Sequence, residues 1–366
     1  MQRILIIRPS ALGDVARTVP CLASLRRAYP EARIDWLVGS AFVDAVRAHP
    51  GLTGVIPFDR KKRSAVWPML RTLRQTRYDM AIDLQGLARS GFFAWASRAK
   101  QRVGYANARE LGWLGYTDKH LIDEKLHAAD RMLRLIDALD VPRVNDLSLH
   151  VPDEDQQWLD QHLAELGVSP GRYACVAPTA QWGCKCWPMQ RYAEVTQRLL
   201  EQPDIDHVFV LAAPHEQARV QAGFTALSPE ELERTATPPT TVGKLMAVLA
   251  GAKLLVCNDS APLHLAVGLA TPTVSLFGPT DPALVGPPPP GFFTPPLGDA
   301  SAVPLPEGSS GQRVADLITT GRHRVLRAPS AVGRTFNYRA HRDDDTLISE
   351  LTVDEAWSAI DQALQP

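Results

Sequence analysis

The sequence predicts an α/β fold made of two doubly wound, Rossmann-like domains. Three observations lead to this prediction. Strand patterns alternate with helix patterns from the N-terminus onward, the alternation restarts after about residue 170, and 366 residues exceed one domain of ordinary size. Strands separated by helices form βαβ units, and these units build parallel sheets with helices on both faces.

The first half opens on the apolar run RILIIR at 3–8, which is typical of a buried strand. Residues 14–29 follow with apolar side chains along one side, as in an amphipathic helix. The same reasoning predicts further alternating elements. The strands are 32–39, 54–59 and 78–84, and the helices are 41–49 and 64–76.

A second series begins with the strand pattern YACVAP at 173–178. Its further strands are 206–214, 252–259 and 271–278, and its helices are 189–201, 215–225, 241–250 and 261–269. A stretch rich in Pro, Gly and Ser at 285–312 indicates an extended or mobile loop. Thr352 and Glu355 form a capping-box pattern that starts a terminal helix over 352–364.

These patterns predict an N-terminal domain over 1–160 and a second Rossmann-like domain over 171–345. We expect the C-terminal helix, at 352–366, to pack back on the N-terminal domain. Open parallel sheets bind ligands at the carboxyl ends of their strands. Two such sheets facing each other would form an interdomain cleft, and we expect the site there.

The composition is that of a globular protein, with 45% hydrophobic and 22% charged residues, and the net charge of −1 gives no indication of nucleic-acid binding. The five cysteines are odd in number and scattered, unlike a disulfide framework. Cys184 and Cys186 lack two further ligands at suitable spacing, so we interpret them as reduced thiols and predict no metal site. We find neither a signal peptide nor an apolar run of about 20 residues, and we expect a cytoplasmic protein.

The segment RPSALGDVARTVP at 8–20 joins the first predicted strand to the first predicted helix. It contains only Gly13, so it is neither the G-x-G-x-x-G of a dinucleotide site nor a P-loop. Asp14 stands where the helix should begin, and an ionised carboxylate at a helix N-terminus suits a general base. Aspartate also caps helices, and from the residues alone we favour the cap.

Two segments of the second half place charged residues after predicted strands. Lys185 lies in PTAQWGCKCWP at 178–188, where a cation suits a diphosphate, although a plain surface lysine is the commoner case. Asp259 and Ser260 end a strand just before a helix, whose free N–H groups form an anion site. His264 lies one turn into that helix, where histidine more often packs than reacts.

Six strings follow one another along roughly residues 1–285. They are ALGDVARTVP (11–20), DLQGLARS (83–90), ARELGWLGY (108–116), APHE (213–216), LAGAKLLVCNDSAPLHLA (249–266) and LFGPTDP (276–282). In this order they resemble the lipopolysaccharide heptosyltransferases of glycosyltransferase family 9. The resemblance implies a GT-B fold and the inverting transfer of L-glycero-D-manno-heptose from ADP-heptose to the Kdo sugar of a lipid A precursor. It implies no metal and no cofactor besides the donor substrate.

The resemblance also implies roles for single residues. Asp14 is the expected general base, and Lys185 is expected to bind the donor's phosphates and assist catalysis. The remaining donor residues are Glu216 at the ribose, Asp259 at the heptose hydroxyls, Ser260 and Ala261 at the diphosphate, Thr240 near the adenine, and His264 as a support of the donor loop.

The acceptor is expected to meet a basic turn, RKKR at 60–63. Four cations there suit the Kdo carboxylate, lipid A phosphates or an anionic membrane surface, while a solvated basic turn is the plain alternative. The acceptor-binding candidates are Arg60, Lys61, Arg63, Gln85, Arg89 and Arg109.

Two departures from the family pattern leave alternatives open. Ala261 stands where the family usually has glycine, and Thr240 and Thr241 stand where it often has methionine. A different nucleotide sugar or acceptor is therefore a second candidate, and a non-catalytic nucleotide-binding protein is a third. The run DDD at 343–345 resembles a metal-binding run, but its polar surroundings favour a solvated loop.

Overall fold

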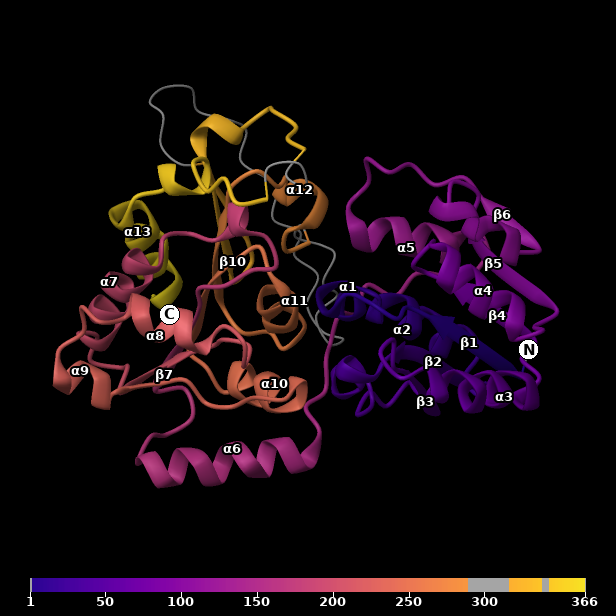
Figure 1. Cartoon of the computed structure of the whole chain (residues 1–366), viewed down its shortest axis with the longest axis horizontal. Coiled ribbons are helices and arrows are strands. Elements are labelled where there is room, and N and C mark those ends of the chain that lie inside the picture. The colour runs from indigo at the N-terminus through magenta and orange to yellow at the C-terminus, as the bar shows by residue number, and fades with distance from the viewer. Residues whose placement is uncertain (1, 289–315, 338–341, 366) are drawn as a thin grey trace. The chain divides into compact units, whose positions relative to one another are not determined.

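The computed structural model describes residues 2–288, 316–337 and 342–365. These residues form two compact units, the first ending at Pro152 and the second beginning at Asp153 (Figure 1). Each unit contains one sheet, mostly or wholly parallel, with helices between the strands, so the predicted α/β class with two Rossmann-like units is confirmed. Within the described ranges, no helix combines the length and the apolar character that a membrane span needs.

The sheet of the first unit has six parallel strands in the order β3-β2-β1-β4-β5-β6. The strands are β1 (Arg3–Ile7), β2 (Arg33–Gly39), β3 (Gly54–Phe58), β4 (Met80–Asp83), β5 (Gln101–Tyr105) and β6 (Asp118–His120). The strand order reverses between β1 and β4, because β2 and β3 extend one side of β1 and the later strands the other. Ligands of such sheets bind beyond the carboxyl ends of the strands at this switch point.

The helices of the first unit connect these strands. They are α1 (Leu12–Arg17), α2 (Val19–Ala28), α3 (Val66–Thr76), α4 (Ala88–Ala96) and α5 (Ala128–Asp137), with short 3₁₀ helices η1 (Ser40–Ala45), η2 (Arg63–Ala65) and η3 (Arg109–Gly115). The elements α4, β5, β6 and α5 are additions to those that the sequence predicts.

Two predicted helices differ in the structure. The helix expected over 14–29 is interrupted at Thr18, whose hydroxyl donates to the carbonyl of Asp14 at 2.8 Å. Pro20, at the start of α2, has no N–H with which to continue the helical bonds. The helix expected over 41–49 is the 3₁₀ helix η1, which closes with the N–H of Val46 bonded three residues back to Val43.

The sheet of the second unit has seven strands in the order β12-β13-β11-β10-β7-β8-β9. They are β7 (Tyr173–Ala177), β8 (His207–Val210), β9 (Thr235–Ala236), β10 (Leu254–Asn258), β11 (Thr273–Phe277), β12 (Asp316–Thr320) and β13 (His323–Arg327). Only the pairing of β12 with β13 is antiparallel among the described strands. The loops after β7, β8, β10 and β11 therefore lie at one edge of the sheet.

The helices of this unit are α6 (Asp153–Leu166), α7 (Met189–Leu200), α8 (Gln217–Gly223), α9 (Pro229–Glu233), α10 (Val242–Ala250), α11 (Ala261–Gly268), α12 (Pro282–Val285) and α13 (Val353–Leu364). The short 3₁₀ helices are η4 (Gly183–Lys185), η5 (Pro329–Ala331) and η6 (Ile348–Glu350). Of the predicted Pro-rich loop at 285–312, residues 289–312 lie outside the described part of the chain.

The second unit begins earlier and ends later in the chain than the sequence predicts. Residues 153–160, expected in the first domain, begin α6 in the second unit, where Asp155 packs against Gly243 of α10. The C-terminal helix α13 also belongs to the second unit and not to the first, because Ala356 and Ile360 are buried in the second unit's core. The predicted capping box of α13 is present, with Thr352 and Glu355 each accepting a hydrogen bond from the other's backbone N–H.

Candidate active site

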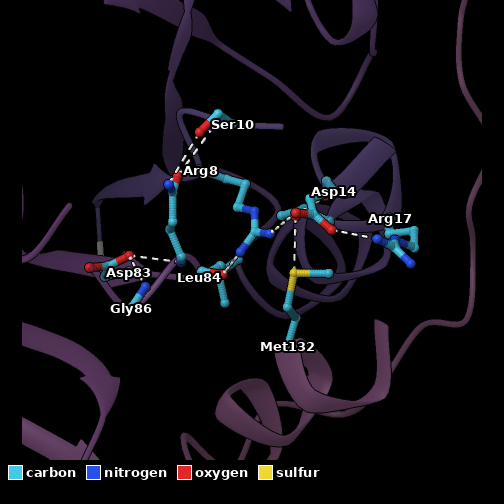
Figure 2. A network of polar contacts seen from close by, with 10 residues as sticks. Arg8, Ser10, Asp14, Arg17, Asp83, Leu84, Gly86 and Met132 are labelled. Carbon is cyan, nitrogen blue, oxygen red and sulfur yellow. Dashed lines mark hydrogen bonds and ion pairs between the residues drawn. The ribbon is translucent and has the colours of Figure 1, made fainter. Parts of the chain in front are cut away.

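Asp14 lies in the first turn of α1, just beyond the carboxyl end of the central strand β1. One carboxylate oxygen is 2.6 Å from Nη2 of Arg8, and the other is 2.5 Å from Nη2 of Arg17 (Figure 2). The Asp14 side chain is 30% exposed, and the two arginines are 12% and 11% exposed. Both oxygens of this carboxylate are therefore engaged by guanidinium groups at the edge of the sheet.

The structure argues against Asp14 as a helix cap, which is the interpretation that the residues alone favour over a general base. The N-cap of α1 is Ala11, whose side chain makes no capping hydrogen bond, and Asp14 lies within the first turn, so Asp14 is not the N-cap. Burial acts to raise the pKa of Asp14, but Arg8 and Arg17 outweigh it and hold this pKa well below its ordinary value. The side chain is thus an ionised carboxylate at physiological pH, and its role as a base remains a prediction.

The loop after β4 holds this network in place from the neighbouring strand. Arg8 donates through Nη1 to the carbonyl oxygen of Leu84 (Figure 2). The side-chain amide of Gln85 accepts from the backbone N–H of Ser10 and donates to its hydroxyl, both at 3.2 Å. Gln85 in turn donates its backbone N–H to Asp83 at 2.8 Å. The segments after β1 and β4 are thereby fastened to each other, which fixes the arginine that faces Asp14.

Asp83 is the buried anchor of that loop. It is 0% exposed and accepts hydrogen bonds from the N–H groups of Gln85 and Gly86 and from the hydroxyl of Tyr116. Burial raises the pKa of Asp83 despite these hydrogen bonds. Its position below the surface indicates a structural role rather than contact with a ligand.

The expected acceptor residues follow the same edge of this sheet. Arg60 and Lys61 are exposed in the turn after β3, and Arg89 lies exposed on α4 with its guanidinium 5.7 Å from the ring centre of Phe58. Arg109 is exposed at the start of η3, and its backbone N–H donates to Gly86 at 3.0 Å.

Gln85 also belongs to this edge, through the bonds to Ser10 described above. The side chain of Arg63 lies outside the described part of the chain, so its expected role has no structural account. The edge that holds Asp14 therefore also presents several exposed cations.

The second unit places Lys185 and Asp259 against each other. Lys185, at the end of η4, lies with Nζ 2.5 Å from Oδ2 of Asp259, which follows β10. Thr280 donates its hydroxyl to the same oxygen at 2.9 Å, and Nε2 of His264 lies 3.9 Å from the other oxygen. Burial acts to raise the pKa of Asp259, but Lys185 and His264 outweigh it, and this pKa lies below its ordinary value.

The N-terminus of α11 adjoins this ion pair. Ser260 is the N-cap residue, yet its side chain makes no capping hydrogen bond, and its buried hydroxyl oxygen has no hydrogen-bond partner among the described residues. Ala261 is the first residue of the helix and is partly buried. An unpartnered hydroxyl beside the free N–H groups of a helix start is suited to an anion, and Lys185 supplies a positive charge nearby.

Glu216 lies after β8 and turns toward the loop after β7. Its Oε2 accepts from the hydroxyl of Thr179 at 2.9 Å and from the N–H of Ala213 at 3.0 Å. Thr240 is partly buried in the connection from β9 to α10 and precedes the N-cap Thr241. All of these loops lie at the carboxyl edge of the second sheet, as the sequence predicts.

Four residues of these sites lie outside the predicted set. Arg8 and Arg17 pair with Asp14, Thr280 bonds Asp259, and the buried Asn258 accepts from the N–H of Trp187 at 3.0 Å. The spacing of three residues between Asp14 and Arg17, and the string LFGPTDP around Thr280, were signals for two of them. The contact of Asn258 joins segments 71 positions apart, which no local pattern reveals.

The cysteines, the potential metal ligands and the DDD run are the remaining candidates for chemistry. All five cysteines are buried, including Cys184 and Cys186, the residues on either side of Lys185. Within the residues that the structure describes, no three or more His, Cys, Asp or Glu side chains come together as a metal site. Asp343 of the DDD run is exposed, as predicted, and it lies beside Gly183 in the loop that ends at Lys185.

Comparisons with known proteins bear on both units. A family model described as glycosyltransferase family 9 (heptosyltransferase) matches residues 66–291. Lipopolysaccharide heptosyltransferase 1 of Pseudomonas aeruginosa is 32% identical over 305 residues, which cover 78% of this chain and 81% of that protein.

Two solved structures resemble the whole chain. The Escherichia coli heptosyltransferase WaaC with ADP-2-deoxy-2-fluoro heptose has a TM-score of 0.69 at 24% identity, covering 99% of each chain. The E. coli ADP-heptose lps heptosyltransferase II has a TM-score of 0.75 at 20% identity, covering 100% of this chain and 98% of that one. At these identities the likeness concerns the fold, and it confirms the fold that the six strings imply.

Proposed function

The chain belongs to glycosyltransferase family 9, the heptosyltransferase family, as its six strings predict, and from that premise we propose the reaction that it catalyses. It transfers L-glycero-D-manno-heptose from ADP-heptose to the Kdo sugar of a lipid A precursor, in assembly of the lipopolysaccharide inner core. The observation that supports this most directly is the anion site of the second unit, where Lys185 and the unpartnered hydroxyl of Ser260 adjoin the start of α11.

In this proposal the second unit binds the donor. Lys185 and the N–H groups at Ala261 hold the diphosphate, since a cation and a helix N-terminus both favour negative charge. Asp259 accepts from heptose hydroxyls, and His264 and Thr280 keep its carboxylate in position.

Glu216 accepts from a ribose hydroxyl, and Thr240 lies near the adenine. The bond from Thr179 orients the Glu216 carboxylate. No bound metal is part of the proposed reaction, because Lys185 and the helix N-terminus supply the positive charge that the departing ADP needs.

The first unit supplies the acceptor site and the base. As the acceptor oxygen bonds to the anomeric carbon, the bond from that carbon to the diphosphate oxygen breaks, and its electron pair leaves with ADP. The hydroxyl proton passes to a carboxylate oxygen of Asp14. One such displacement inverts the anomeric carbon and needs no second carboxylate.

Both Asp14 oxygens face arginines in the free protein, so the acceptor hydroxyl must take the place of one of these contacts. Arg8 is also bonded to the Leu84 carbonyl of the neighbouring strand, which holds its guanidinium in place from a second side. The anionic groups of a Kdo–lipid A acceptor provide an alternative partner for the displaced guanidinium.

We also propose that the protein works at the cytoplasmic face of the inner membrane, in peripheral contact with it. The acceptor is itself a lipid, and the exposed cations Arg60 and Lys61 suit its phosphates or anionic headgroups.

The test is to incubate the purified chain with ADP-heptose and a Kdo–lipid A precursor and to weigh the product by mass spectrometry. An added mass of one heptose is the expected result. Calorimetry with ADP, UDP and GDP addresses the second candidate, which Ala261 and Thr240 favour. Tighter binding of UDP or GDP would overturn the ADP assignment, and ADP binding without transfer to any precursor would favour a non-catalytic protein.

A further inference from the structure

Most of the large apolar side chains that are exposed among the described residues belong to the first unit. Among the described residues they include Trp67, Phe92, Trp95, Leu111, Leu114 and Leu121, with exposed fractions between 43% and 79%. Single exposed apolar residues need no explanation, but a cluster of them marks an interaction site. Four of the six lie on two adjoining elements, α4 and η3.

Glycines bring these two elements into direct backbone contact. A Cβ atom on Gly91 of α4 would lie 2.1 Å from the carbonyl oxygen of Gly112, and one on Gly115 would lie 2.0 Å from that of Gly91. Phe92, Leu111 and Leu114 are the chain neighbours of these three glycines. The close approach therefore gathers their side chains at the surface, because no other side chain fits between the backbones.

The exposed face of α4 has a regular order. Arg89, Phe92 and Trp95 follow one another at intervals of three residues, and all three are exposed. Arg98 is exposed too, but it lies two residues beyond the end of α4 and has a left-handed φ of 55°. The rings of Phe92 and Trp95 have their centres 5.8 Å apart. Two aromatic rings thus lie side by side on the exposed face of α4, and Arg89 precedes them on the same face.

The backbone of η3 keeps its leucines outward. Glu110 and Leu111 have φ angles of 55° and 61°, the left-handed region that non-glycine residues avoid. Leu111 is nevertheless 62% exposed and Leu114 is 63% exposed. Backbone strain of this kind is typical of functional segments, and here the strained turn presents apolar side chains to solvent.

We propose that one surface docks the protein on a bilayer of anionic phospholipid. It comprises Arg89, Phe92 and Trp95 of α4, Arg98 just after α4, and Arg109, Leu111 and Leu114 of η3. Aromatic and leucine side chains insert at the headgroup boundary, and the arginines pair with lipid phosphates. The only acidic residue within α4 and η3 is Glu110, whereas the proposed surface has three arginines. The surface therefore complements an anionic headgroup layer.

The surface adjoins the proposed acceptor site, because Arg89 and Arg109 lie on the same two elements. The inference deepens the proposed function in this respect, since an acceptor embedded in a bilayer would be reached from the bilayer surface. Lipid binding itself can be measured without any transfer reaction, which keeps the two proposals separable.

The test is co-sedimentation of the full chain with vesicles of phosphatidylethanolamine and phosphatidylglycerol, with phosphatidylcholine vesicles as the neutral reference. The double variant Phe92→Ser, Trp95→Ser should bind the anionic vesicles at least about tenfold more weakly, because two aromatic side chains no longer insert. Leu232→Ser is the matched control, since Leu232 is 48% exposed on α9 of the second unit. Thermal unfolding midpoints equal to that of the parent chain establish that each variant is folded.

The outcomes separate the alternatives. Equal vesicle binding by the parent and the double variant would overturn the inference, as would a parent that binds no anionic vesicle. The parent chain could instead form dimers and bind no vesicles, with the double variant remaining monomeric. That result would show that a second copy of the chain occupies the surface, and it would overturn the inference. Vesicle binding through the surface without heptose transfer to a soluble, deacylated acceptor would refute the proposed function and leave the inference intact.

Discussion

Replacing Asp14 with asparagine removes the proposed base and keeps the shape of the side chain. We expect kcat to fall by about 10²–10⁴-fold, the usual contribution of a general base. The affinity for ADP should change little, because the proposed donor ligands Lys185 and Glu216 belong to the other unit. Transfer is measured by mass spectrometry of the product, and ADP affinity by calorimetry.

The same substitution should also lower the free energy of unfolding. Arg8 and Arg17, at 12% and 11% exposure, lose their shared counter-ion. Breaking a fully buried ion pair costs about 3–5 kcal/mol, and the 30% exposure of Asp14 reduces the expected loss to about 1–3 kcal/mol. The loss is measured by denaturant unfolding at pH 7.

The effect on stability should depend on pH with a definite sign. The folded-state pKa of Asp14 lies below its ordinary value of 3.8. The ionised carboxylate therefore stabilises the folded state above pH 3.8, and this contribution disappears as the pH falls through the lower folded-state pKa. The unfolding free energies of the parent and the Asp14→Asn variant should accordingly converge in acid.

Asp44→Asn is the matched control for these measurements. Asp44 is also 30% exposed in the first unit and lies 2.7 Å from an arginine three residues away, Arg47. This variant should keep full turnover. The assignment of Asp14 as the base is refuted if Asp14→Asn retains more than about a tenth of the parent kcat, since a general base contributes at least about 10²-fold.

Three further changes test the remaining contacts. Arg17→Gln should raise the pKa of Asp14 by about 1–3 units, seen by carbon NMR of the labelled carboxyl, and an unchanged pKa would contradict the pairing. Lys185→Met should weaken ADP binding by about 10–100-fold in calorimetry, because a charge-assisted hydrogen bond is lost, whereas equal affinity would exclude Lys185 as a phosphate ligand. Gly115→Ala should lower the unfolding free energy by about 1–3 kcal/mol in denaturant titrations, because the new Cβ would meet the backbone of Gly91. An unchanged unfolding free energy would show that η3 can shift away from α4 without cost.

Much of the fold could be predicted from local pattern. Apolar runs such as Ile4 to Ile7 are fully buried strands in the structure, because a central parallel strand is covered on both faces. The strand β5 and the helix α4 were harder to predict. β5 has partly exposed residues at both ends, and α4 exposes two of its aromatic residues. In neither element do the apolar residues of the sequence coincide fully with the buried positions, so the hydrophobic pattern did not reveal them.

For the candidate site, local patterns show which residue types follow which strands, and so they place Asp14, Lys185 and Asp259 at sheet edges. The partners of these residues follow only from the three-dimensional arrangement of the loops. The structure shows that Asp14 faces two arginines and is no helix cap, and that Lys185 meets Asp259, 74 positions away. Periodicity and capping act over a few residues, whereas ion pairs form where parallel strands bring distant loops to one edge of the sheet.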